Sequence, residues 1–250
     1  MIFAGGGEFF MDNLVGEFVG TIVLVTFGCG SVANVNLEKS KAKGAGWTAL
    51  ALAWGLAVML GASTSIALGA PQADLNPAIT FIKVFLGIYT FPQFIVTSLV
   101  QIAGGIVGGI FVWLLFLPHW ELTEDKSIKL AVFSTGPAVR KSSTNFLCEM
   151  IATGFLMFCI WMLTAQTSIL PQNFVPFFVG LLIVALTFSF GGPTGLALNP
   201  ARDLGPRIAH AILPIAGKGS SDWGYSWIPV VAPFFGTVLA FIAMKILGLF

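Results

Sequence analysis

The sequence predicts an all-α membrane protein with six transmembrane helices, two re-entrant half-helices and an inverted internal repeat. Of its 250 residues, 56% are hydrophobic and only 9% are charged, with a mean hydropathy of +0.92, whereas soluble domains carry about 25% charged residues. Six apolar stretches are long enough to cross a bilayer. The tetrapeptide Leu-Asn-Pro-Ala occurs twice, at 75–78 and 198–201, each time between two of these stretches.

The expected spans follow from the lengths of the apolar stretches. A helix needs about 20 apolar residues to cross a hydrocarbon core of about 30 Å, and small residues are tolerated within it. The expected spans are residues 12–34, 46–70, 91–117, 144–167, 173–192 and 225–249. The two Leu-Asn-Pro-Ala segments lead into shorter helices, Ala78–Leu86 and Ala201–Leu213. About ten residues rise only ~15 Å, which is half a membrane.

The spans form two repeats with the same order of elements. Repeat one covers about 12–117, repeat two covers about 144–250, and residues 118–143 connect them. Each repeat has two spans, a half-helix and a third span. Because three is an odd number, the second repeat lies upside down relative to the first, and the half-helices enter from opposite faces. The connecting segment is expected to be a solvated connection and not a site.

The repeated Asn-Pro-Ala triplet has the composition of a helix start. Asn is favoured at the N-cap and Pro at the first helical position. Two half-helices from opposite faces would meet N-terminus to N-terminus at the midplane, with both positive dipole ends at the centre. Free N–H groups there must face protein or water. The passage between them would favour neutral, oxygen-bearing solutes and oppose cations. Its expected caps are Asn76, Pro77, Ala78, Asn199, Pro200 and Ala201.

The residues before each triplet must cross this depth without helical hydrogen bonds. Their carbonyl groups are expected to form a ladder of acceptors along the passage. The residues expected in this ladder are Ala73, Asp74, Leu75, Gly195, Ala197 and Leu198. Glu17 and Glu149 occupy the same place in the first span of each repeat. Because charges are costly in lipid, both should face the interior of the bundle with partners.

These motifs resemble the aquaporin family (major intrinsic proteins) over essentially the whole chain. The second triplet continues as Arg202-Asp203, and an Asp at this place is similar to the glycerol-facilitator (aquaglyceroporin) branch. The resemblance implies a single channel domain, residues 1–250, with both termini in the cytoplasm. It also implies a homotetramer in a cell membrane, in bacteria the plasma membrane. The positive-inside rule alone predicts the opposite orientation.

The resemblance also implies a selectivity filter. Its four positions match Trp54, Thr187, Leu196 and Arg202. Glycerol facilitators commonly have Gly and Phe in place of Thr187 and Leu196, and strict water channels usually have His in place of Thr187. We therefore expect an opening wider than that of a water channel. Trp54 and Leu196 would face carbon atoms of a small polyol, and Arg202 and Thr187 would face its oxygen atoms.

Three carboxylates are expected to support the pore loops. In related channels the groups equivalent to Glu17 and Glu149 accept hydrogen bonds from the irregular backbone before the half-helices. Asp203 is expected to bind backbone donors or Arg207. Asp74 stands where most relatives have His, and a capping or loop-fixing role is expected there over attraction of cations.

The expected function is a passive channel for small uncharged solutes, glycerol first and water second. Protonated lactic acid, urea and dihydroxyacetone stay open as solutes, because Leu196 is not aromatic. An ion-coupled secondary transporter also uses inverted repeats, and its coupling site could involve only Glu17, Asp74 or Glu149. The pattern indicates no enzyme, cofactor or metal site. A net charge of +1 without a basic stripe excludes nucleic acid as a partner.

Two smaller patterns concern packing. Gly104 with Gly108, and Gly105 with Gly109, have the small-xxx-small spacing that lets membrane helices approach closely. The three cysteines are odd in number and lie in or beside apolar runs, which is typical of reduced, packed thiols. They are Cys29, Cys148 and Cys159.

Overall fold

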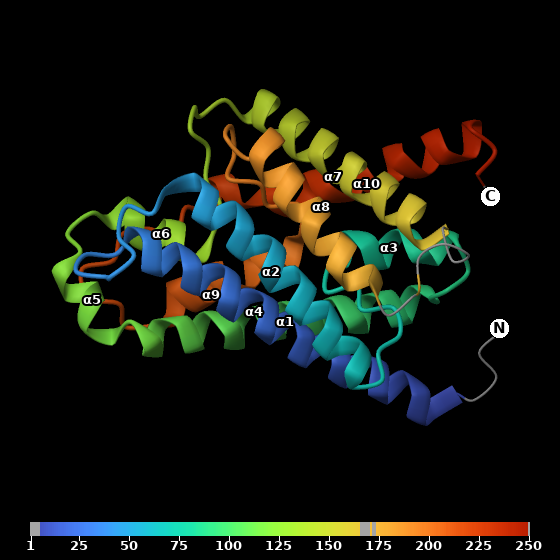
Figure 1. Ribbon diagram of the computed structural model, residues 1–250, viewed down its shortest axis with the longest axis horizontal. Coiled ribbons are helices and arrows are strands. Elements are labelled where there is room, and N and C mark those ends of the chain that lie inside the picture. Colours follow the sequence, from blue (N-terminus) through green and yellow to red (C-terminus); the bar gives the residue numbers. More distant parts are fainter. Residues whose placement is uncertain (1–5, 166–170, 172–173, 250) are drawn as a thin grey trace.

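This computed structural model describes residues 6–165, 171 and 174–249, and within these ranges its regular structure is entirely helical (Figure 1). The first group of helices is α1 (Gly6–Asn36), α2 (Gly46–Ala67), α3 (Pro77–Phe85) and α4 (Phe91–Leu115). Two short helices follow, α5 (Leu117–Leu122) and α6 (Lys126–Phe133). The second group is α7 (Ser142–Ala165), α8 (Val175–Phe190), α9 (Pro200–Ile212) and α10 (Trp223–Ile246).

The long helices lie at the expected spans but differ from them at their ends: α1, for example, begins at Gly6 and not at residue 12. Among the described residues, α1, α2, α4, α7 and α10 are long and apolar enough to cross a membrane. Helix α8 is apolar but has only 16 residues, which rise ~24 Å. It is shorter than the expected span 173–192 because it ends before Gly191-Gly192-Pro193, a sequence unsuited to a helix. Residues 166–167 and 173 of the expected spans lie outside the described residues.

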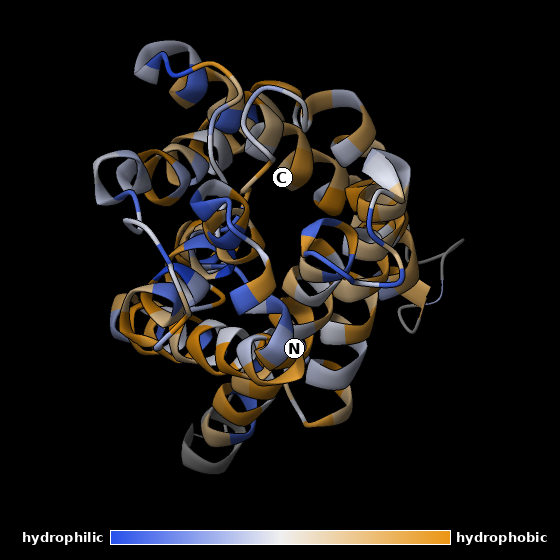
Figure 2. Cartoon of the chain, turned by 90° about the vertical axis from the view of Figure 1, so that its left-hand side faces the viewer, coloured by the Kyte–Doolittle hydropathy of each residue, from blue (hydrophilic) through white to orange (hydrophobic). Residues whose placement is uncertain are grey.

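The two groups of helices repeat one order: two long helices, a short one and another long one. Helix α1 starts and α10 ends at the same end of the bundle (Figure 1). Large apolar side chains such as Leu52, Leu99, Phe188 and Leu239 are about half exposed or more. In a view from one end of the bundle, hydrophobic residues predominate in the helices, and many hydrophilic residues lie in the loops and short helices (Figure 2). This distribution suits a protein surrounded by lipid.

The glycines of α4 allow two helices to pack closely on it. A Cβ atom added to Gly104 would lie 2.6 Å from the carbonyl oxygen of Phe18 in α1. A Cβ atom added to Gly105 would lie 2.6 Å from the carbonyl oxygen of Ala201 in α9. Successive glycines therefore face different partners, so α4 holds the second half-helix against the first repeat.

The expectation that residues 118–143 form only a solvated connection is wrong. Trp120 and Phe133 are buried and stack with ring centroids 5.6 Å apart. Helix α6 packs against α1 and α9. The residues after it, Ser134 and Thr135, line the central cavity. The segment folds inward because burying these aromatic side chains removes a large apolar area from water.

Candidate solute pathway

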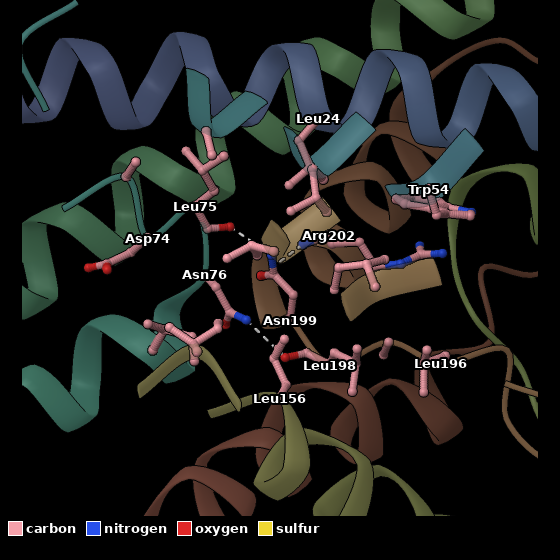
Figure 3. Close-up of a pocket in the computed structure, with 18 of the residues that line it drawn as sticks. Leu24, Trp54, Asp74, Leu75, Asn76, Leu156, Leu196, Leu198, Asn199 and Arg202 are labelled. Carbon is pink, nitrogen blue, oxygen red and sulfur yellow. Dashed lines mark hydrogen bonds between the residues drawn. The ribbon is translucent and has the colours of Figure 1, made fainter. Parts of the chain in front are cut away.

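A cavity of about 970 Å³ is lined by residues from both repeats and from the connecting segment. It contacts Asn76, Asn199, all four expected filter residues and all six residues of the expected carbonyl ladder. Asp74 lies on one side of the Asn pair, and Trp54 and Arg202 lie on the other (Figure 3). We call the end lined by Gln72, Asp74 and Lys83 the α3 mouth, and the end beyond Arg202 the filter mouth.

Each half-helix begins at the Asn-Pro pair in the same conformation. Asn76 has φ −153° and ψ 111°, and Asn199 has φ −147° and ψ 111°. The side-chain oxygen of Asn76 accepts a hydrogen bond from the backbone N–H of Ala78 at 3.0 Å. That of Asn199 accepts one from Ala201 at 2.9 Å. Both side chains therefore turn their oxygen to their own helix and their NH₂ group away from it.

The two NH₂ groups join the half-helices reciprocally. Asn76 Nδ2 donates to the carbonyl oxygen of Leu198 at 3.0 Å, and Asn199 Nδ2 donates to that of Leu75 at 2.6 Å (Figure 3). The second N–H of each amide has no protein acceptor among the described residues. The carbonyl oxygens of Leu75 and Leu198 each already accept this hydrogen bond. They therefore have less capacity to accept another than the other carbonyl groups of the expected ladder.

Glu17 holds the loop before α3. Its carboxylate accepts hydrogen bonds from the backbone N–H of Asp74 at 2.7 Å and of Leu75 at 2.8 Å. It also accepts one from Gln101 Nε2 at 2.8 Å, and both side chains are fully buried. A buried charge with several donors is stabilised where an unpaired one would not be. Glu17 does not line the cavity and acts from behind the loop.

Glu149 holds the loop before α9 in the same way. It accepts hydrogen bonds from the backbone N–H of Ala197 at 2.9 Å and of Leu198 at 3.0 Å. The hydroxyl of Thr194 donates to it at 2.6 Å. Thr194 is thus the side-chain donor to Glu149, as Gln101 is the side-chain donor to Glu17 behind the first loop. The two loops therefore have matching backbone contacts but different side-chain support.

Both loops contain residues in the left-handed region of backbone conformation. The φ angles are +41° at Ala73, +51° at Leu75, +57° at Leu196 and +58° at Leu198. A non-glycine residue in this region costs of order 1–2 kcal/mol. The carboxylate behind each loop binds the N–H groups at this bend and so offsets the cost. These left-handed residues keep each loop out of a helix, which leaves its carbonyl groups free of helical partners.

The filter mouth combines a cation with an aromatic ring. The Arg202 guanidinium carbon lies 3.8 Å from the ring centroid of Trp54, a favourable cation–π arrangement. Among the described residues, its N–H groups donate to no protein atom. The Thr187 hydroxyl donates to the carbonyl oxygen of Ile183 at 2.7 Å, so it can only accept from a solute. Leu196, only 6% exposed, lines the same cavity.

Asp203 and Arg207 form a fully buried ion pair behind the filter. The Oδ1 atom of Asp203 lies 2.8 Å from Arg207 Nη2, and its Oδ2 atom accepts from the backbone N–H and hydroxyl of Thr135 at 2.7 and 2.6 Å. Arg207 donates to the carbonyl oxygens of Thr135 at 2.9 Å and Ser221 at 2.8 Å. The pair thus ties the connecting segment and the loop before α10 to α9.

Asp74 is paired with a lysine at the α3 mouth. Lys83 Nζ forms an ion pair with Asp74 Oδ1, and the hydroxyl of Thr80 donates to Asp74 Oδ2 at 3.1 Å. The side chain of Asp74 is only 1% exposed. Lys83 Nζ also donates to Gln72 Oε1 at 2.8 Å. Near the end of the second half-helix, Lys218 instead donates to the backbone carbonyl oxygens of His210, Ala211 and Leu213.

Several residues of this region are not predictable from the motifs. Gln101 is a polar residue in an apolar span, which is a usable signal. Lys83 and Thr194 carry no such signal, because a charged or hydroxyl group near a loop is common. Thr135 lies in the segment expected to be solvated. Its contact with Asp203 depends on how that segment folds back over α9.

Two half-helices whose caps meet beside a cavity lined by polar and apolar residues, inside a bundle of apolar helices, define a membrane channel. The chain belongs to the major intrinsic protein family, whose model matches residues 8–244. It is a multi-pass membrane protein and not an enzyme, and the expected fold class is confirmed.

Similar proteins support the assignment to this family over almost the whole chain. The chain is 46% identical over 235 residues to glycerol uptake facilitator protein 3 of Lactiplantibacillus plantarum, covering 94% of this chain and 96% of that one. It is 38% identical over 235 residues to the D/L-lactic acid transporter of the same organism, covering 92% and 95%. The X-ray structure of the aquaglyceroporin from Plasmodium falciparum matches with a TM-score of 0.78 and 28% identity, covering 94% and 96%.

Proposed function

We propose that this chain is a passive channel for small uncharged solutes, with glycerol as the favoured solute and water as the second. The observation that carries the proposal is a cavity lined by both Asn caps, by both loops and by the four residues of the proposed filter. The similarity to a protein named as a glycerol uptake facilitator and to an aquaglyceroporin of known structure supports the choice of solute.

The proposed filter is Trp54, Thr187, Leu196 and Arg202. A polyol has carbon on one side and hydroxyl groups on the other. Trp54 and Leu196 offer an apolar wall for its carbon side. Arg202 has free donors for solute oxygen, since no protein atom of the described residues takes them. Thr187 accepts a hydrogen bond from the solute. The solute can therefore exchange its water hydrogen bonds for protein ones at little cost.

Beyond the filter, the solute would meet the Asn caps and the carbonyl ladder. The proposed caps are Asn76, Pro77, Ala78, Asn199, Pro200 and Ala201, and the proposed ladder is Ala73, Asp74, Leu75, Gly195, Ala197 and Leu198. The positive ends of α3 and α9 and the charge of Arg202 oppose cations. Glu17, Glu149 and Asp203 are proposed to support the loops without contacting the solute.

We further propose one channel domain of two repeats, about 12–117 and 144–250, joined by 118–143. The proposed assembly is a homotetramer in a bacterial plasma membrane. The wide apolar outer surface would serve both lipid and subunit contacts. Mass measurement of the protein in native-like nanodiscs should give four chains, and a single chain per particle would contradict the assembly.

Lactic acid in its protonated form is the second candidate solute. A relative named as a D/L-lactic acid transporter supports it, and so does the aliphatic residue at Leu196. Stopped-flow swelling of proteoliposomes with glycerol, water and lactic acid, at low and neutral pH and without ion gradients, tests both candidates. Glycerol flux well above that of empty vesicles is expected. Flux that appears only with a proton or sodium gradient would contradict a passive channel.

Leu196→Phe should narrow the range of solutes. A larger ring at this wall of the filter would take space from the cavity, so flux of lactic acid should fall several-fold more than flux of water. Leu99→Phe is the matched control, because Leu99 is 61% exposed on the outer surface. Unchanged selectivity in Leu196→Phe would remove Leu196 from the filter.

Gly28→Ala should reduce glycerol flux by moving Trp54. A Cβ atom at Gly28 would overlap the six-membered ring of Trp54, and overpacking of this kind costs about 1–3 kcal/mol. Arg202 and the cavity adjoin this ring, so a ring displaced from α1 should narrow the passage and hinder glycerol more than water. In the control Gly30→Ala, the added Cβ atom meets only Val112, at 4.0 Å. Equal flux in both variants would show that Trp54 does not limit passage.

A further inference from the structure

The α3 mouth contains an ion pair that has no counterpart in the second repeat. Counting from the Asn caps, Asp74 corresponds to Ala197, and Lys83 corresponds to Pro206. Both Asp74 and Lys83 line the cavity. The pair is therefore a feature of this mouth alone and not a requirement of the half-helix design.

The Lys83 ammonium is surrounded by oxygen atoms. It contacts Asp74 Oδ1, Gln72 Oε1 at 2.8 Å and the carbonyl oxygen of Gln72 at 3.5 Å. These are a carboxylate, an amide oxygen and a backbone carbonyl, which are the ligand types that hard cations such as Ca²⁺ prefer. The three N–H groups of the ammonium match three acceptors.

Without the Lys83 ammonium, the surroundings of this site would attract cations. The Asp74 side chain is almost fully buried, and its backbone N–H is bound by the Glu17 carboxylate, so a second negative charge lies nearby. Lys83 itself belongs to the last turn of α3, where a helix carries a negative partial charge. Without Lys83, nothing else in the described contacts of Asp74 carries a positive charge.

We infer that Lys83 is a tethered cation that fills an oxygen-lined cation site at the α3 mouth and thereby keeps ions from binding in the pathway. The inference rests on the proposed function, because it concerns the passage of neutral solutes past this mouth. Asp74 and Lys83 together are specificity-determining residues: they present a polar surface to the solute with no net charge.

Lys83→Met should create a calcium-sensitive channel. The variant keeps the length of the side chain but leaves Asp74 and the two oxygen atoms of Gln72 without their cation. Ca²⁺ at about 10 mM, above the roughly millimolar dissociation constants of weak calcium sites, should lower its glycerol flux by about threefold or more. Chelation should restore the flux. Flux through the wild-type protein should not respond to Ca²⁺.

Three further variants separate this effect from general damage. Asp74→Asn/Lys83→Met lacks the carboxylate and should be insensitive to Ca²⁺, and Lys83→Arg keeps the cation and should behave as the wild type. Lys43→Met is the matched control, because Lys43 pairs with Glu38 on the exposed surface. The inference is overturned if Ca²⁺ leaves Lys83→Met unaffected, or if the double variant is equally sensitive.

A binding measurement distinguishes failure of the inference from failure of the proposed function. Equilibrium dialysis of ⁴⁵Ca²⁺ with detergent-solubilised protein needs no transport. Lys83→Met should bind one Ca²⁺ per chain more than the wild type. If the wild type carries no glycerol but this extra ion binds, only the proposed function fails. If Lys83→Met does not fold, Lys83→Ala removes the same cation and should bind the extra Ca²⁺; a folded Lys83→Ala that binds none would equally overturn the inference.

Discussion

Arg207→Met is expected to lower the free energy of unfolding by about 3–5 kcal/mol, because it leaves the Asp203 carboxylate buried without its cation. Both side chains are fully buried. The change also removes the donors to the carbonyl oxygens of Thr135 and Ser221. The measurement is denaturant unfolding of the purified protein in detergent micelles.

Removing both charges should cost less than removing one. In Asp203→Asn/Arg207→Met, the amide oxygen can still accept from Thr135, and no unpaired charge is left, so we expect recovery of at least half of the lost stability. Arg140→Met is the control for loss of an arginine. Its pair with Asp222 is exposed on the Arg140 side, and such pairs contribute about 0–1 kcal/mol. A double variant as unstable as Arg207→Met would contradict the argument.

Glu149→Gln is expected to reduce glycerol flux per channel by about tenfold or more. The carboxylate accepts from Ala197, Leu198 and Thr194, whereas an amide has a single acceptor oxygen. Hydrogen bonds to charged groups contribute about 1.5–3 kcal/mol each. Losing one or two of them is comparable with the cost of the left-handed residues Leu196 and Leu198, so the loop should leave its present path. Stopped-flow flux, normalised to the protein incorporated, measures the effect.

The same change in the first repeat should have a similar effect. Glu17 binds Asp74 and Leu75 through the equivalent N–H groups. Glu124→Gln is the control, because Glu124 is exposed in the connecting segment. If Glu149→Gln and Glu17→Gln both carry glycerol like Glu124→Gln, the loops hold their shape without the carboxylates, and the support role would have to be given up.

The contacts of the buried carboxylates also bear on ion-coupled transport. A coupling site needs a carboxylate that can bind and release an ion or proton during each cycle. Glu17 and Glu149 are each engaged by two backbone N–H groups and a side-chain donor. Asp74 is engaged by Lys83 and Thr80. All three candidates are thus occupied by fixed protein donors, which favours a passive pathway.

The features predicted from the sequence agree best with the structure where a local residue pattern favours one kind of backbone structure. Asn76-Pro77 and Asn199-Pro200 begin helices because an Asn cap and a Pro at the first position suit only that place. The long helices follow from apolar length. Their ends are less regular: α8 ends before Gly191, where the sequence has two glycines and a proline.

The sequence by itself determined the membrane setting, the two half-helices and the presence of paired carboxylates inside the bundle, because apolar length, cap chemistry and the cost of buried charge act locally along the chain. Only the tertiary structure decided that each Asn amide binds the other repeat, that Lys83 neutralises Asp74, and that Thr135 reaches Asp203. These contacts join segments far apart in the sequence or depend on the path of a loop, and local patterns carry no information about which distant groups will meet.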